Sequence, residues 1–233
     1  MDKPVVLITG VGPGVGAAAA ERFARDGHRV AMLARDADRL RALEARIPGA
    51  RAFPCDVADD EALARTVDAV RDALGDPGVA IHNAVGGAFG TFREIEPATL
   101  RRNFETNVMA LFNLARLVSP AMETAGRGAI LVTGNTSALR GKPGFAGFAP
   151  TKAAQRILCE SLARDLGPKG VHVAYFVIDA VIDVPWTRAR WADKPDDFFI
   201  KPAAIAEELW RVAHQDRSAW SFNVELRPFR EPW

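Results

Sequence analysis

The chain is poor in residues and segments that mark several protein classes. It has two cysteines in 233 residues, Cys55 and Cys159, far apart and each inside an apolar segment. We therefore expect two core thiols in a reduced compartment and no disulfide framework. No hydrophobic run is long enough to span a bilayer, and the strand-like residues 5–8 follow Met1 too closely for a secretion signal. These features predict a soluble, cytoplasmic protein.

The chain also lacks an excess of charge of either sign. It carries 30 Lys plus Arg against 29 Asp plus Glu, a formal net charge of +1, without a basic run. This balance predicts no nucleic-acid partner and no binding to an anionic membrane. The length suits one sizeable core, and no linker or internal repeat divides the sequence, so we expect a single domain over residues 1–233.

Short β-rich runs alternate with segments whose apolar residues recur at helical spacing. The expected strands are residues 5–9, 29–34, 50–55, 79–83, 129–133, 171–178 and 220–226. The expected helices are residues 17–26, 39–47, 61–74, 100–122 and 153–166. This alternation predicts an α/β fold, a doubly wound parallel sheet of about seven strands with helices on both faces. Residues 180–200 are long for a connection and hold four aromatic side chains, so we expect a lid on the substrate side.

A glycine-rich turn follows the first expected strand. It contains Gly10, Gly12, Gly14 and Gly16, with Val15 standing where strict GxGxxG spacing from Gly10 needs glycine. A strand, a turn without Cβ atoms and a helix N-terminus together suit a pyrophosphate, because backbone N–H groups can approach it closely. The alternative is a flexible turn with no ligand. In this strand-to-helix context, the turn predicts a nicotinamide dinucleotide site.

Arg35 ends the second expected strand, where an NAD site usually has an acidic residue for the ribose hydroxyls. A guanidinium can hold a 2′-phosphate through charge-assisted, bidentate hydrogen bonds. NADP(H) is therefore favoured over NAD(H). The alternative is an ordinary solvated arginine that pairs with Asp36 or Asp38.

Further motifs appear in a fixed order after the glycine turn. They are Asp56 and Val57, then Asn83 and Ala84 in a turn followed by Val85, then Asn107, and then Lys152. With these motifs the chain resembles the short-chain dehydrogenase/reductase family over nearly all of its length. The resemblance implies a Rossmann-like single domain, in which Asp56 and Val57 contact adenine and Asn83 and Ala84 line the cofactor. It also implies that Asn107 and Lys152 belong to the active site, and that Lys152 binds the cofactor by holding its ribose.

Two positions depart from the family pattern. The family has a tyrosine four residues before the lysine as general acid or base, and here that residue is Phe148. The family serine thirteen residues earlier is Asn135. A phenyl ring carries no proton to donate, whereas the Asn135 amide can still donate a hydrogen bond to a substrate oxygen. The one tyrosine, Tyr175, lies inside an expected strand and is a poor replacement.

Other titratable groups have two interpretations each. His82 is either a titrating group near the cofactor or a buried structural histidine at a strand end. Asp179 and Asp183 are either an acid and base pair close to substrate, or partners of Arg188 and Arg190. In both cases the structural interpretation is the expected one.

Two functions follow from these observations. The first is an NADP(H)-dependent oxidoreductase that moves hydride to or from a small carbonyl or alcohol, with water, Lys152 or a substrate group as the proton source. The second is an NADP(H)-binding protein with little or no redox activity, a sensor or partner subunit. The resemblance also implies a homodimer or homotetramer formed through residues 100–122 and 153–166. No residue pattern predicts a metal.

Overall fold

The computed structural model describes residues 3–231; expectations for residues 1–2 and 232–233 lie outside them. A seven-stranded sheet forms the centre, with strand order β3-β2-β1-β4-β5-β6-β9 and parallel pairing throughout. The strands are β1 (Val5–Thr9), β2 (Val30–Ala34), β3 (Ala50–Pro54), β4 (Pro77–His82), β5 (Gly128–Asn135), β6 (Val171–Ile178) and β9 (Asn223–Leu226). The predicted doubly wound parallel sheet is confirmed.

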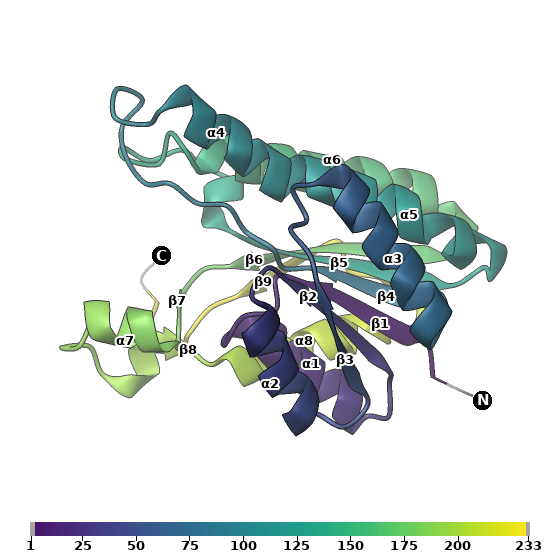
Figure 1. Ribbon diagram of the computed structural model, residues 1–233. Coiled ribbons are helices and arrows are strands. Elements are labelled where there is room, and N and C mark those ends of the chain that lie inside the picture. The colour runs from purple at the N-terminus through teal and green to yellow at the C-terminus, as the bar shows by residue number, and fades with distance from the viewer. Residues whose placement is uncertain (1–2, 232–233) are drawn as a thin grey trace.

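Helices cover both faces of this sheet (Figure 1). One layer contains α1 (Val15–Arg25), α2 (Ala37–Arg46) and α8 (Pro202–Ala213). The other contains α3 (Asp60–Leu74), α5 (Ala110–Thr124) and α6 (Ala149–Leu166). In β1, Val5 and Leu7 face the α3–α5–α6 core, while Val6 and Ile8 face the α1–α2–α8 core. Burial on both faces explains why the strands are continuous apolar runs without polar alternation.

The helix expected over residues 100–122 differs from the prediction. It begins earlier, as α4 (Pro97–Phe104), passes through a π-helical turn at Glu105–Met109, and continues as α5. Apolar spacing predicts a helix but does not show a one-residue widening of its hydrogen-bond pattern. Such turns are frequent at functional sites.

The segment after β6 holds more structure than the expected loop. It forms a two-stranded ribbon of β7 (Val181–Ile182) and β8 (Phe199–Ile200), with the short helix α7 (Pro185–Arg190) between them. Helix α8 follows and was not predicted, although Ile205, Ala206 and Leu209 bury one of its faces.

The strand order reverses between the neighbouring strands β1 and β4. From β1 the sheet continues through β2 to β3 on one side, and from β4 it continues through β5 to β6 on the other. Ligands in open α/β sheets bind beyond the carboxyl ends of the strands at such a point. In Figure 1 this edge lies on the left, where α4 and α7 extend from opposite layers.

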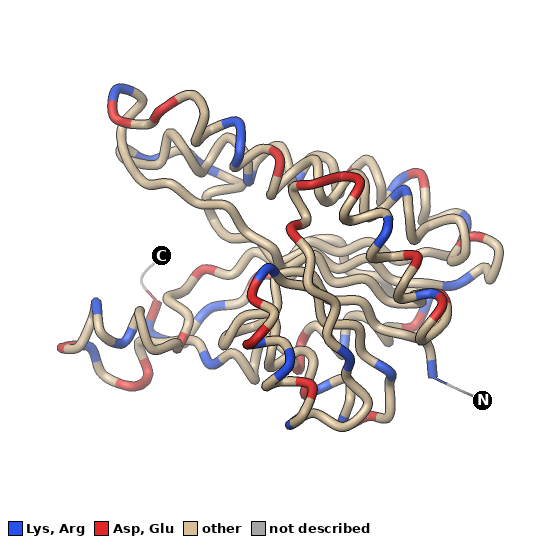
Figure 2. The backbone as a smooth tube through the Cα atoms, in the orientation of Figure 1, with Lys and Arg blue, Asp and Glu red and all other residues tan. Residues whose placement is uncertain are grey.

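Lys and Arg lie interspersed with Asp and Glu over the outer helices (Figure 2). In residues 3–231, no helix has the length and apolarity that a membrane crossing requires.

Candidate cofactor and active site

The glycines of the turn after β1 serve two different purposes. Gly10 has φ +69°, and a Cβ on it would lie 2.5 Å from the Ala84 backbone. A Cβ on Gly16 would lie 2.7 Å from Val11 Cα. Gly12, by contrast, has nothing within 4 Å of its Cβ position. Gly10 and Gly16 therefore allow close backbone packing, while Gly12 leaves open space in front of the turn.

Helix α1 begins at this open space. Gly14 is its N-cap and supplies no side-chain capping bond, and the first turn contains no acidic residue. The backbone N–H groups of Val15 and Gly16 belong to this turn, whose positive dipole end favours an anion. The residues present therefore fit a dinucleotide pyrophosphate.

Arg35 lies directly after β2 and is exposed. The neighbouring Asp36 caps α2 by accepting a bond from the Arg39 N–H at 3.0 Å and also pairs with the Arg39 guanidinium at 2.7 Å. Asp38 pairs with Arg41. Within residues 3–231 Arg35 itself forms no ion pair. Its charge is therefore available to a ligand at the end of β2.

The predicted adenine pair follows β3. Val57 is buried, and the Asp56 carboxylate accepts bonds from Ala58 N at 3.1 Å and from Arg102 Nη2 at 2.9 Å. The Asp56 side chain is thus held in place by its own turn and by α4.

A hydrogen-bond network joins the carboxyl ends of three strands. Thr9 Oγ1 accepts from Asn83 N at 3.2 Å and from Ala84 N at 3.3 Å. Asn83 Nδ2 donates to Gly10 O at 2.8 Å, and Thr133 Oγ1 donates to Asn83 Oδ1 at 3.0 Å. The predicted cofactor residues Asn83 and Ala84 are therefore fixed to the glycine turn.

His82 is fully buried within this network. Its Nδ1 lies 3.1 Å from Thr9 Oγ1. That oxygen already accepts two N–H bonds, so the Thr9 hydroxyl donates its own proton to His82 Nδ1. Burial, together with the Lys152 ammonium, lowers the pKa of His82 to about 3. His82 is therefore a neutral residue of the strand end, in agreement with the structural interpretation.

Lys152 is also buried, one turn into α6. Its Nζ donates to Gln155 Oε1 at 2.9 Å and to Thr133 O at 3.3 Å, and Gln155 Nε2 donates to Asn107 O at 2.6 Å. Burial lowers the pKa of Lys152 to about 8. Sequence reasoning missed Gln155, whose only signal was its position three residues after the lysine on the same helical face.

Asn107 lies in the π-helical turn before α5. Its Nδ2 donates to Gly86 O and to Thr151 Oγ1, both at 2.8 Å, and its Oδ1 accepts from Gly86 N at 2.8 Å. The side chain is fully engaged, so Asn107 acts by holding the loop after β4 and the start of α6 together. Its carbonyl meets Gln155 beside Lys152.

Phe148 is the N-cap of α6 and is buried. Its ring packs against Phe89 with centroids 5.4 Å apart, and Lys152 Nζ lies 5.9 Å from the ring centroid. Tyr175 is buried in β6, where its hydroxyl lies 3.5 Å from Lys152 O. Burial raises the pKa of Tyr175 well above its usual value, so its hydroxyl stays protonated inside the sheet.

Comparison with known proteins agrees with this geometry. The family model described as short chain dehydrogenase matches residues 4–194. The chain belongs to the short-chain dehydrogenase family. Its relatives are named as dehydrogenases and reductases, and the chain is an oxidoreductase of this family.

Two curated relatives and one solved structure illustrate the similarity. The 7alpha-hydroxysteroid dehydrogenase of Escherichia coli is 33% identical over 177 residues, covering 74% of this chain and 69% of that protein. The 1-deoxy-11-beta-hydroxypentalenate dehydrogenase of Streptomyces exfoliatus is 32% identical, covering 97% and 86%. A metagenomic short-chain oxidoreductase solved with NADP is 29% identical, covers 97% of both chains and superposes with TM-score 0.84.

Asn135 lies at the end of β5 in this short-chain dehydrogenase. Its Oδ1 accepts from Ser137 N at 3.1 Å and caps the turn Thr136–Ala138, which leaves the two Nδ2 protons without an acceptor in residues 3–231. Asn135 and Asp179 line a cavity of about 200 Å³. Ser137 lines both this cavity and a neighbouring one of about 720 Å³.

The carboxylates after β6 have separate surroundings. Asp183 pairs with Arg188 at 2.5 Å and with Lys201 at 2.8 Å, and these cations hold its pKa well below the usual value. Asp183 is thus an ion-pair partner, as the structural interpretation expected, with Lys201 in place of Arg190. At the base of the same segment, Val184 Cγ1 lies 3.0 Å from the Cβ position of Gly14.

Proposed function

We propose that this chain is an NADP(H)-dependent oxidoreductase that transfers hydride between the cofactor and a small carbonyl or alcohol, through a site without the usual tyrosine. The observation that carries the proposal is the open glycine turn with the unpaired Arg35 beside it. Further support comes from the metagenomic relative, which was solved in complex with NADP. The cofactor contacts at Gly10, Gly12, Gly14, Val15, Gly16, Asp56, Val57, Asn83 and Ala84 belong to the same proposal.

The bound nicotinamide supplies or accepts the hydride. Asn135 Nδ2 is oriented by the bond that its Oδ1 accepts, and it donates to the substrate oxygen as negative charge develops there. Lys152 supplies the proton, because its lowered pKa, about 8, brings proton release close to neutral pH. Phe148 excludes water from the neighbourhood of this ammonium.

In this proposal the reacting oxygen lies in the smaller cavity beside Asn135, and the rest of the substrate extends past Ser137 into the larger cavity. The larger cavity, of about 720 Å³, is lined mostly by apolar groups, among them Phe92, Leu139 and Phe145, with the cations Arg93, Arg140 and Lys142 also at its wall. An apolar pocket with a few polar groups at one end favours a small, largely apolar ligand. We propose that residues 180–200 form the lid, since Val184 at their base lies beside Gly14 of the glycine turn and the Trp186 side chain is 60% exposed.

The second function is retained because of one observation. The Phe148 ring packs with Phe89 in an apolar group where the family places its acid. A protein that binds NADPH without turnover, as a sensor or partner subunit, matches this packing.

The decisive experiment measures NADPH binding and NADPH oxidation with a panel of apolar ketones and aldehydes. We expect turnover that Lys152→Met lowers by about 100-fold or more. The exposed Lys169, which pairs with Glu123 and Asp165, provides the control Lys169→Met with unchanged rates. Tight NADPH binding without turnover by the natural chain would overturn the redox function and favour the sensor.

The pH profile of carbonyl reduction tests the proton donor separately. Only the protonated ammonium can donate, so the rate should be full below the pKa of Lys152 and fall as pH rises through about 8. A rate that is flat up to pH 10 would assign the proton to water or to the substrate.

We also propose a homo-oligomer formed through α5 and α6. Phe112 and Ile157 are 39% and 57% exposed on these helices, and Met109, directly before α5, is 38% exposed; all three offer apolar area to a second copy. Light scattering should show a dimer or tetramer that Ile157→Lys weakens. Both cysteines are buried free thiols, which supports work in a reducing compartment such as the cytoplasm.

A further inference from the structure

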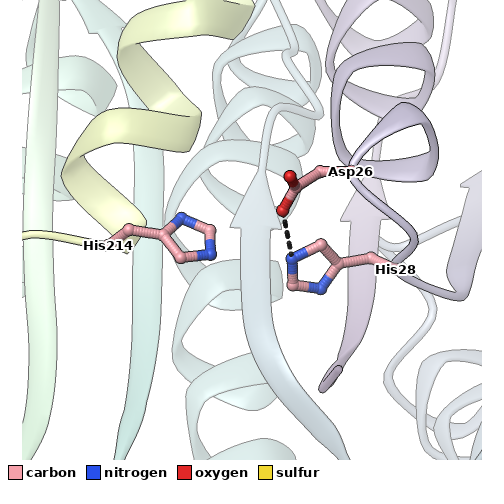
Figure 3. A group of neighbouring side chains, drawn as sticks. All are labelled: Asp26, His28 and His214. Atoms are coloured by element: carbon pink, nitrogen blue, oxygen red, sulfur yellow. Dashed lines mark ion pairs between the residues drawn. The ribbon is translucent and has the colours of Figure 1, made fainter. Parts of the chain in front are cut away.

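Three potential metal ligands converge at the amino edge of the sheet, opposite the glycine turn. Asp26 ends α1, His28 precedes β2, and His214 ends α8. One oxygen or nitrogen atom from each lies within 4.8 Å of the other two. Figure 3 shows the Asp26 carboxylate and the two imidazole rings gathered between these elements. Residues far apart in sequence thus form one cluster.

The protonation of both rings follows from their backbone partners. His28 Nδ1 lies 2.8 Å from Pro4 O, and His214 Nδ1 lies 2.7 Å from Trp210 O. A carbonyl only accepts, so each Nδ1 carries the hydrogen and each neutral ring presents the lone pair of Nε2. Histidines that bind metals are oriented in this same way, by donation from the other ring nitrogen to a carbonyl.

The His28 Nε2 atom has no hydrogen-bond partner in the described chain, although the side chain is only 2% exposed. It faces Asp26 Oδ2 at 3.5 Å, and both atoms are acceptors when His28 is neutral. Asp26 Oδ2 accepts from Lys3 Nζ at 2.5 Å and from Trp210 Nε1 at 3.2 Å, whereas the buried His28 Nε2 faces it without a donor. A metal cation between the two atoms would satisfy the His28 lone pair as well as the carboxylate.

The spacing fits a tetrahedral ion. Zinc bonds of about 2.0–2.1 Å to nitrogen and oxygen place neighbouring ligand atoms roughly 3.3 Å apart. The atoms of His28 and Asp26 already meet this spacing at 3.5 Å. The third ligand, His214, is exposed and so has room to close the remaining gap. Two imidazoles with one carboxylate are a ligand set typical of zinc.

We propose that Asp26, His28 and His214 bind one Zn²⁺ ion, with water as the fourth ligand. The ion joins the turn between α1 and β2 to the end of α8. Arg22 of α1 already contacts α8, through an ion pair with Glu207 at 2.5 Å and with its guanidinium 4.0 Å from the Trp210 ring centroid. Because the site lies at the edge opposite the cofactor turn, its role is to stabilise the fold.

One cation already competes for this site. The Lys3 ammonium lies 2.5 Å from Asp26 Oδ2, the same oxygen that faces His28. Zinc binding displaces this ammonium, so removal of the Lys3 charge should tighten zinc binding.

The test titrates Zn²⁺ into the full chain after chelator treatment, by calorimetry and by thermal unfolding. We expect one ion per chain and a rise in Tm that grows with zinc concentration. His214→Gln should weaken binding at least 100-fold, and because His214 is exposed this variant keeps the fold. His172→Gln, which removes a histidine outside the cluster, is the matched control and should bind as the natural chain does. Lys3→Met should bind severalfold more tightly.

Several results would overturn the proposal. These are no saturable binding by the natural chain, equal binding by His214→Gln, or a Tm that zinc leaves unchanged. Asp26→Asn provides a second variant, which should also weaken binding. The affinity for NADPH should not change with zinc, so failure here is distinct from failure of the proposed redox function.

Discussion

The carboxyl edge of the sheet has two halves, which differ in how many of the side chains expected from the family pattern are present. On the side of β1 and β2, the glycine turn, Arg35 and the Thr9–Asn83 contacts form the site that we propose for the cofactor. On the side of β5 and α6, Lys152 keeps its place while Phe148 lies in an apolar group and Asn135 presents an amide. We therefore propose to test cofactor binding and proton transfer separately in this chain.

The largest expected effect comes from restoring the tyrosine and serine of the family pattern, which tests whether the two halves differ only in these side chains. Phe148→Tyr combined with Asn135→Ser should raise the rate of carbonyl reduction by about 10²- to 10⁴-fold, because a positioned acid then serves the substrate oxygen. The measurement is NADPH oxidation at saturating cofactor. Phe145→Tyr, on a neighbouring aromatic of the larger cavity, is the control and should bring no gain. An inert double variant that still binds NADPH would show that the two halves differ by more than two side chains.

A substitution of Arg35 tests how the β1–β2 half contributes to the affinity for NADPH. Arg35→Ser should weaken NADPH binding by about 1.5–3 kcal/mol, roughly tenfold to hundredfold, since charged hydrogen bonds to the 2′-phosphate are lost. NADH binding should stay unchanged, and both affinities can be read from fluorescence titration. Arg39→Ser, which removes a guanidinium paired with Asp36, serves as the control. An equal loss for both cofactors would contradict the role of Arg35.

Two glycines of the turn should respond differently to alanine. Gly10→Ala forces a Cβ against the Ala84 backbone at positive φ and should lower the free energy of unfolding by about 1–3 kcal/mol. Gly12→Ala meets no protein atom and should leave stability unchanged while weakening NADPH binding. Urea unfolding and cofactor titration of both variants measure this. Equal stability of the two would mean that the turn relaxes around Gly10.

A further expected effect is a loss of stability at mildly acidic pH. His82 has a pKa of about 3 in the folded chain, below its ordinary value near 6.5, so the unfolded chain takes up the proton first. Stability is full above pH 6.5 and falls by about 1.4 kcal/mol for each pH unit below it, until pH approaches 3. Urea unfolding at pH 7 and pH 5.5 should show this loss, and His82→Gln should reduce it. An unchanged slope in that variant would place the acid sensitivity elsewhere.

Local patterns predicted the sheet and the glycine turn between β1 and α1 well, because a strand buried on both faces and a glycine turn before a helix leave clear traces in sequence. They missed α8, whose apolar spacing is short and follows Pro202 without a capping side chain. They also missed the π-helical turn at Asn107, since apolar spacing hardly changes when the hydrogen-bond pattern widens by one residue.

The sequence by itself determined the parallel α/β sheet, the place of the glycine turn after the first strand, and the position of Phe148 four residues before Lys152. Only the tertiary structure decided how Gln155 connects Lys152 to the Asn107 carbonyl, and that His28 and His214 face one carboxylate. The reason is physical. Periodicity and turn chemistry are properties of neighbouring residues, whereas these contacts form only when the packing of distant helices on the sheet brings their side chains together.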